Sequence, residues 1–297
     1  MTTRQKAMQI FTAAVNAVQP SQLIPAHLFI EGDTLHIFDR HFFINELPGI
    51  YVIGAGKASA SMAKTAEEIL GHLISAGIVV TKYGHSLPLQ KIICPEAAHP
   101  VPDEKGLAAT ATTIELLQKV NENDIVICLI SGGASALWID IPPSASLADL
   151  QQTFQLLLSC GATIYEMNTI RIHLSSIKGG QLVQWAPKAN WFSFIISDVP
   201  GDSLSTIGSG PTVADDTSFE DANKIFIKYN LHNQLPASIQ RHINDGIEGI
   251  IKDTPKAGDK TLKNSYNKII GSNSLALDAA RAKAIQLGYN VASVKKI

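Results

Sequence analysis

Four short loops of small and polar residues follow apolar runs in this sequence and could together form one site. The first loop contains Lys57, the second is Ser131-Gly132-Gly133, the third contains Asp198, and the fourth begins at Gly271. The run before the second loop, residues 125–130, is apolar without alternation, which is typical of a strand buried on both faces of a parallel sheet. In open parallel sheets the ligand lies beyond the carboxyl ends of the strands, near the point where the strand order reverses. The four loops therefore predict one shared site at that edge.

The first two loops are suited to binding an anion. Gly54-Ala55-Gly56-Lys57 precedes an amphipathic helix, so backbone N–H groups and one positive charge could hold a phosphate. The loop is neither a P-loop nor a dinucleotide fingerprint, because Tyr51 and Ser59 stand where those motifs need glycine. Ser131-Gly132-Gly133 is followed by residues 134–137, which can start a helix with its N–H groups at the same edge. A solvated lysine beside a structural turn explains the first loop equally well.

Two further side chains have plausible roles in such a site. Asp198 at the end of a strand could bind Mg²⁺ or orient a hydroxyl group, although an N-cap or turn aspartate is the commoner use. His99 lies in a loop with three prolines, residues 95–106, which predicts a fixed, extended backbone. Its imidazole could polarise a substrate carboxylate or only pack beneath the loop.

The segment from Glu166 to Gly180 has helical periodicity with one apolar and one polar face. Asn168, Arg171 and Lys178 fall on the polar face, together with Ser175. Arg171 and Lys178 could hold a small carboxylate, with arginine better suited to a two-pronged contact. A polar stripe is usually the solvated face of a helix, so both interpretations stay open.

The elements that must position these residues predict an α/β protein. Apolar strand-like runs alternate with amphipathic helices, which indicates a Rossmann-like three-layer sandwich with a mostly parallel sheet. Residues 1–251 form the main domain, 252–266 read as a polar linker, and 267–297 as a strand, a helix and a strand at 290–294. Near the N-terminus a helix over 3–18 and a hairpin over 28–38 are expected.

Composition narrows the class of protein. The 297 residues are 45% hydrophobic and 17% charged, as in an ordinary globular protein. A net charge of −2 argues against attachment to nucleic acid or an acidic membrane. Cys94, Cys128 and Cys160 are far apart and predict neither a disulfide framework nor a zinc site. With no signal peptide or membrane span recognised, a cytoplasmic location is expected.

Five motifs give the sequence a more specific resemblance. They are GAGKAS (54–59), HPVPDEKG (99–106), LISGGASAL (129–137), GATIYEMNTIRIHLSSIKGGQL (161–182) and SDVPGDSLSTIGSGPT (197–212). In this order they resemble the signatures of the class II glycerate 2-kinases, proteins with a MOFRL-associated N-terminal domain that are often mislabelled as hydroxypyruvate reductases. The resemblance extends over nearly the whole chain.

The resemblance implies transfer of the γ-phosphoryl group of ATP, with Mg²⁺, to the 2-hydroxyl of glycerate. Lys57 and Asp198 would be catalytic, Lys57 by stabilising charge on the transferring phosphate and Asp198 near the metal or the glycerate hydroxyl. The nucleotide and its phosphates would contact Gly54, Gly56, Ser131, Gly132, Gly133 and Ser135. Glycerate would contact His99, Asn168, Arg171 and Lys178.

The sequence also departs from the family pattern. Two family glycines are replaced by Ala98 and Ala134, and a basic residue by Ile172. The family's C-terminal MOFRL domain, which carries a catalytic arginine, is expected to be absent, and its absence would impair turnover. One alternative is an NAD(P)-dependent hydroxypyruvate reductase, weakened by Gly77 where a ribose-binding acid would stand. Another is a non-catalytic nucleotide-binding or assembly module, with a homodimer as its simplest form.

Overall fold

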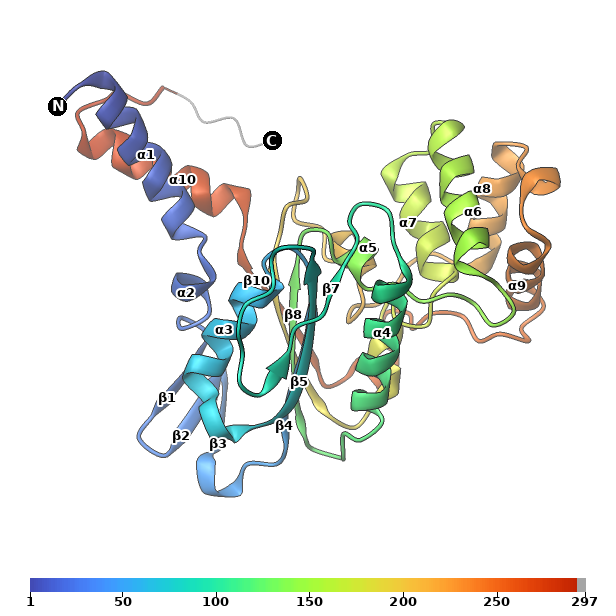
Figure 1. The fold of residues 1–297 in the computed structure, drawn as a ribbon, viewed down its shortest axis with the longest axis horizontal. Coiled ribbons are helices and arrows are strands. Elements are labelled where there is room, and N and C mark those ends of the chain that lie inside the picture. The colour runs from blue at the N-terminus through green and yellow to red at the C-terminus, as the bar shows by residue number, and fades with distance from the viewer. Residues whose placement is uncertain (293–297) are drawn as a thin grey trace.

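A seven-stranded sheet, flanked by helices, forms the centre of the protein in the computed structural model, which describes residues 1–292 (Figure 1). The strand order is β10-β9-β8-β4-β5-β6, with β7 also paired to β5, and every pairing in this sheet is parallel. The strands are β4 (Ile50–Ala55), β5 (Ile74–Lys82), β6 (Ile92–Ile93), β7 (Glu96–Ala97), β8 (Ile125–Ser131), β9 (Asn190–Ile196) and β10 (Ser265–Gly271). The predicted α/β class with a mostly parallel sheet is confirmed.

Strand β8 lies inside the sheet between β4 and β9, and all seven of its residues are buried. Its side chains alternate between two cores: Val126, Cys128 and Ile130 face one, and Ile127 and Leu129 face the other. Burial on both faces explains why this stretch is apolar without alternation in the sequence. It also fixes the loop that follows β8 at the carboxyl edge of the sheet.

Helices and a small sheet cover the two faces. One core is closed by α2 (Pro20–Leu23), α3 (Ser59–Leu70) and a small antiparallel sheet, and the other by α4 (Glu104–Leu117) and α5 (Ala134–Leu137). The small sheet consists of β1 (Leu28–Glu31), β2 (Thr34–Ile37) and β3 (Arg40–Phe43). The hairpin of β1 and β2 was expected, whereas β3 was not, because its four residues carry no long apolar run.

Four helices pack together beside the sheet around a core of their own (Figure 1). They are α6 (Leu147–Ser159), α7 (Ile164–His173), α8 (Phe219–Lys228) and α9 (Ala237–Ile247). Helix α7 ends at His173, so the helical stripe expected to run on to Gly180 is wrong in its second half. Ser175 and Lys178 lie in the turns beyond it, where Asp140 accepts hydrogen bonds from Ser175 Oγ and the Ser176 amide.

The two ends of the described chain lie side by side. Helix α1 (Thr3–Ala17) packs against α10 (Asn273–Gln286), away from the sheet (Figure 1). The polar stretch 252–266 contains a short turn of helix, η6 (Lys260–Leu262), and leads into β10 at the edge of the sheet. Of the strand expected at 290–294, residues 290–292 are not in a strand and 293–294 lie outside the described residues. No helix in residues 1–292 is long and apolar enough to cross a membrane.

Candidate functional site

The strand order reverses between β4 and β8, and the loops after these two strands meet at the carboxyl edge of the sheet. From β4 the chain continues to β5 on one side and later returns to β8 on the other side of β4. Connections that leave in opposite directions open a crevice at the carboxyl edge, which is where ligands bind in open parallel sheets. The loop after β4 carries Lys57, and the loop after β8 is residues 131–133. The residues singled out from the sequence therefore meet at this reversal point.

Glycine is required where these two loops touch. Gly56 has φ +136°, and a Cβ atom there would lie 2.2 Å from Ser131 Oγ. The Lys57 amide donates to the Gly132 carbonyl at 2.9 Å, and the Ala58 amide donates to Ser131 Oγ at 3.0 Å. The Gly56 amide donates to Val80 O at 3.1 Å. Because these amides are satisfied within the protein, the first loop offers a ligand the Lys57 side chain rather than its backbone.

The second loop has the opposite character. The N–H groups of Gly132, Gly133, Ala134 and Ser135 have no hydrogen-bond acceptor within the described part of the chain. Gly133 adopts φ +90°, which lets the chain turn directly from β8 into α5. Free backbone amides in a glycine-containing loop can bind an anion such as a phosphate.

Three charged or titratable side chains converge on this loop. Lys57 Nζ lies 3.7 Å from Asp198 Oδ2, and both side chains are about half exposed (43% and 55%), so a ligand can reach them. A Cβ atom on Gly132 would fall 1.9 Å from Asp198 Oδ2, and one on Gly133 would fall 3.0 Å from His99 Nε2. Burial lowers the pKa of His99, and the positive charges of Lys57 and Lys82 lower it further against the opposing effect of Asp198. The imidazole is therefore neutral near neutral pH.

The donor set suits a cation that arrives with phosphate oxygens. Among residues 1–292 no group of three or more His, Cys, Asp or Glu side chains could hold a metal ion. Mg²⁺ is commonly bound by one or two carboxylates together with water and substrate phosphates. Asp198, beside the free amides of the 132–135 loop, is a carboxylate that fits this arrangement.

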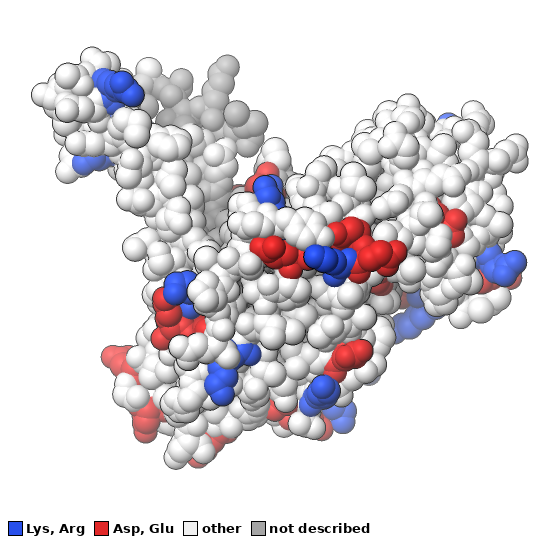
Figure 2. Space-filling model, in the orientation of Figure 1, with Lys and Arg blue, Asp and Glu red and all other residues white. Residues whose placement is uncertain are grey.

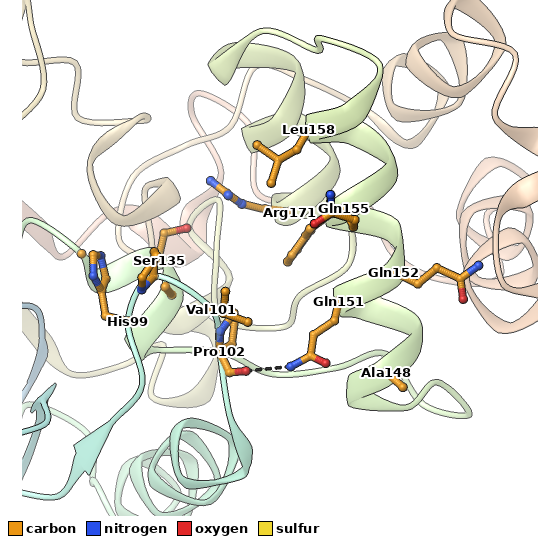
Figure 3. A pocket seen from close by; sticks show the side chains of 14 residues that line it. His99, Val101, Pro102, Ser135, Ala148, Gln151, Gln152, Gln155, Leu158 and Arg171 are labelled. Atoms are coloured by element: carbon orange, nitrogen blue, oxygen red, sulfur yellow. Dashed lines mark hydrogen bonds between the residues drawn. The ribbon is translucent and has the colours of Figure 1, made fainter.

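A pocket of about 570 Å³ opens next to the same loop (Figure 3). His99 and Ser135 lie on one side, α6 forms the opposite wall, and the Arg171 side chain lies between them. Gly133 also lines the pocket. The Gln151 side-chain amide donates to the Pro102 carbonyl at 2.9 Å and ties α6 to the 99–102 loop. This hydrogen bond joins the two walls of the pocket.

Hydrogen bonds connect the β8 loop to α7. Ser135 Oγ lies 2.9 Å from Ser209 Oγ, which donates to Asn168 Oδ1 at 3.4 Å. Arg171 Nη1 donates to the same Asn168 oxygen at 3.3 Å. The structure thus brings Asn168 and Arg171 to Ser135, as a common site requires. Ser209 itself was missed, and its only sequence signal is its place between Gly208 and Gly210 in a long loop.

Lys178 occupies a different position. Its side chain is buried (4% exposed) and does not line the pocket, and its Nζ donates to the Trp138 carbonyl at 2.5 Å. Burial lowers its pKa to about 8, against an opposing effect of Asp140. Lys178 connects the turn after α7 to the end of α5, which makes it a structural support in this arrangement.

This burial predicts an unusual pH dependence of stability for Lys178. Its pKa is about 8 in the folded protein against a usual value of 10.5, so between these values the unfolded chain binds more protons. The free energy of unfolding should therefore rise from pH 8 to 10.5, by at most about 3 kcal/mol from this group. Urea unfolding at several pH values should show this rise in the wild type and not in Lys178→Met. Lys188→Met, at a lysine that is 71% exposed, should behave as the wild type, and three parallel curves would contradict the assignment.

Surface charge is mixed on the face that Figure 2 shows, where Lys and Arg alternate with Asp and Glu. Together with the net charge of −2, this gives that face no broad basic patch for a nucleic-acid backbone. The site just described, with its local lysine and free amides, is suited to a small anionic ligand.

Comparison with known proteins identifies the family of the chain. A family model described as a domain of unknown function, DUF4147, matches residues 6–244. A Pyrococcus horikoshii protein named glycerate 2-kinase is 39% identical over 290 residues, which are 97% of this chain and 64% of the relative. The chain belongs to the class II glycerate 2-kinase family.

Two further matches complete the comparison. An Agrobacterium vitis protein, provisionally named hydroxypyruvate reductase, is 39% identical over 293 residues, 97% of this chain and 60% of the relative. A crystal structure of a Pyrococcus horikoshii protein superposes with a TM-score of 0.87 at 39% identity, covering 98% of this chain and 65% of that one. The chain thus spans a little under two thirds of the length of the relatives it matches.

Proposed function

We propose that this protein transfers the γ-phosphoryl group of ATP to the 2-hydroxyl of glycerate and yields 2-phosphoglycerate. The observation that carries the proposal is the convergence of Lys57, Asp198 and His99 on four free backbone amides where the strand order reverses. Phosphoryl transfer needs positioned reactants and neutralised charge more than covalent chemistry by the protein. Amides, one lysine and one carboxylate beside each other provide both.

Each residue then has a role that follows from its position. The amides of residues 132–135 bind phosphate oxygens, and Lys57 Nζ neutralises the charge that spreads over the transferring group. Asp198 is placed to accept a hydrogen bond from the attacking hydroxyl or to bind a cation. Mg²⁺, when bound, supplies neutralisation of the phosphate oxygens. Lys57 also holds Asp198 over the loop through their ion pair.

Glycerate binding is assigned to the polar residues around Ser135. Arg171 is partly buried and keeps its charge although burial lowers its pKa, so it can bind a carboxylate. Asn168 holds the guanidinium in place through the hydrogen bond from Arg171 Nη1. Neutral His99 can donate or accept a hydrogen bond at the opposite side.

The proposed reaction predicts one product. The chain, incubated with ATP, Mg²⁺ and D-glycerate, should form 2-phosphoglycerate, which ³¹P NMR distinguishes from 3-phosphoglycerate. The Pyrococcus horikoshii relative serves as the positive control in the same assay. Formation of no phosphorylated glycerate above the enzyme-free control would contradict the proposal.

The provisional name of the Agrobacterium vitis relative supports a second candidate, reduction of hydroxypyruvate by NAD(P)H. Against it, Ser59, which replaces the third glycine of a dinucleotide fingerprint, is fully buried, and its Oγ donates to the Gly56 and Val80 carbonyls. Oxidation of NADH or NADPH by hydroxypyruvate, followed at 340 nm, separates the two candidates. We expect no oxidation above the enzyme-free rate.

A further inference from the structure

The pocket beside the β8 loop has one polar end and one apolar wall. The polar end is formed by His99, Gly133 and Ser135, and the apolar wall includes Phe154 and Leu158 of α6. Glycerate carries an oxygen on each of its three carbons, so it has no apolar surface to bury against this wall. A volume of about 570 Å³ also exceeds what so small an acid needs. The pocket fits a larger ligand with an anionic end and an apolar, planar end.

We propose that the apolar part of this pocket binds the adenine base of ATP, with the base between α6 and the 99–102 loop. The proposal rests on the proposed function and adds to it the place of the base. The polar end adjoins the free amides of residues 132–135, so a nucleotide whose base contacts α6 has its phosphates directed toward Lys57. Base and phosphates thus bind to one continuous surface.

Hydrogen bonds connect the two walls of the pocket. The hydrogen bond from Gln151 to Pro102 sets the distance between α6 and the 99–102 loop (Figure 3). Helix α6 itself begins with a capping box formed by Ser146 and Asp149, and Asp149 also accepts a hydrogen bond from Ser238 near the start of α9. A slot of fixed width favours a flat ring over a flexible chain, because less conformational entropy is lost on binding.

Side chains on α6 suit the edge and the face of the ring. The Phe154 ring lies under the Arg171 guanidinium, 5.2 Å from its centroid, which holds both planar groups in place. The Gln155 side-chain amide donates to Ser159 Oγ at 3.3 Å, and its carbonyl oxygen is an acceptor for an amino group such as that of adenine. Leu158 is 60% exposed and lines the pocket, so an adenine base that covers it removes apolar surface from water.

Comparing a nucleotide with its phosphate chain alone tests this proposal. Isothermal titration would measure the affinity of the chain for AMPPNP and for inorganic tripolyphosphate, each with Mg²⁺. The wild type should bind AMPPNP about tenfold more tightly than tripolyphosphate, because only the nucleotide buries apolar surface. Leu158→Ser should weaken AMPPNP binding about fivefold and leave tripolyphosphate binding within about twofold.

A matched control is available on another helix. Ile227 on α8 is 55% exposed and does not line the pocket, so Ile227→Ser should leave both affinities unchanged. Equal effects of Leu158→Ser and Ile227→Ser on AMPPNP would overturn the proposal, as would a Leu158→Ser effect confined to the KM for glycerate. In both cases the proposed kinase function would stand. Failure of the wild type to bind either ligand would instead reject the nucleotide site as a whole.

Discussion

Lys57→Met is expected to lower kcat for glycerate phosphorylation by about a thousandfold. Lys57 Nζ is the positive charge beside the free amides of the β8 loop, 3.7 Å from Asp198. Methionine keeps the length and the apolar stem of the side chain but removes the charge that stabilises the transferring phosphoryl group. Transfer of ³²P from [γ-³²P]ATP to glycerate measures the rate over the range required.

Lys64→Met provides the matched control on α3, the helix that follows the Lys57 loop. Lys64 lies on α3, is 49% exposed and pairs with Glu68, so its replacement should leave the rate within about twofold. Retention of more than a tenth of the wild-type rate in Lys57→Met would show that the lysine is a solvated residue beside a structural turn.

Gly132→Ala should reduce kcat about a hundredfold while leaving the protein folded. The new Cβ atom would lie 1.9 Å from Asp198 Oδ2, so the carboxylate must leave its position over the β8 loop. Asp198 is 55% exposed and can turn into solvent, and the backbone of Gly132 does not require a left-handed conformation. The free energy of unfolding, from urea titration, should therefore change by less than about 1 kcal/mol.

A double-mutant cycle shows whether Asp198 carries this effect. In an Asp198→Ala background the added methyl group meets no carboxylate, so Gly132→Ala should change kcat by less than about threefold. If the two losses multiply instead, the methyl group acts through the amides of the loop rather than through Asp198.

The sequence was sufficient for the sheet and for the edge where the site lies. Residues 125–130 are apolar without alternation because β8 is buried on both faces. Gly56, Gly132 and Gly133 follow strands, whereas Gly54, expected in the loop, lies within β4. In an open parallel sheet the ligand binds beyond the carboxyl ends of the strands, so this edge can be predicted from the strands alone. The resemblance implied that His99, Asn168 and Arg171 contact glycerate and that Ser135 contacts the nucleotide. The structure places these residues around one pocket and its hydrogen-bond network.

Details that depend on long-range contacts could not be read from the sequence. The amides of the first loop donate hydrogen bonds to Gly132 O and Ser131 Oγ, so only the amides of the second loop stay free. These hydrogen bonds join residues more than 70 positions apart, which sequence patterns do not reveal. The end of α7 at His173 hides Lys178 from the pocket, although helical spacing put it on the same face as Arg171. The apolar wall of the pocket comes from α6, whose leucines and phenylalanine read equally well as core residues.

The central claim is that the loops after β4 and β8 bind the phosphates of a nucleotide. Isothermal titration of AMPPNP with Mg²⁺ into the wild type, Lys57→Met and Lys64→Met tests it most directly. The claim predicts binding by the wild type and Lys64→Met and an affinity about tenfold lower for Lys57→Met. Equal affinity of all three proteins, or no binding by the wild type, would contradict it.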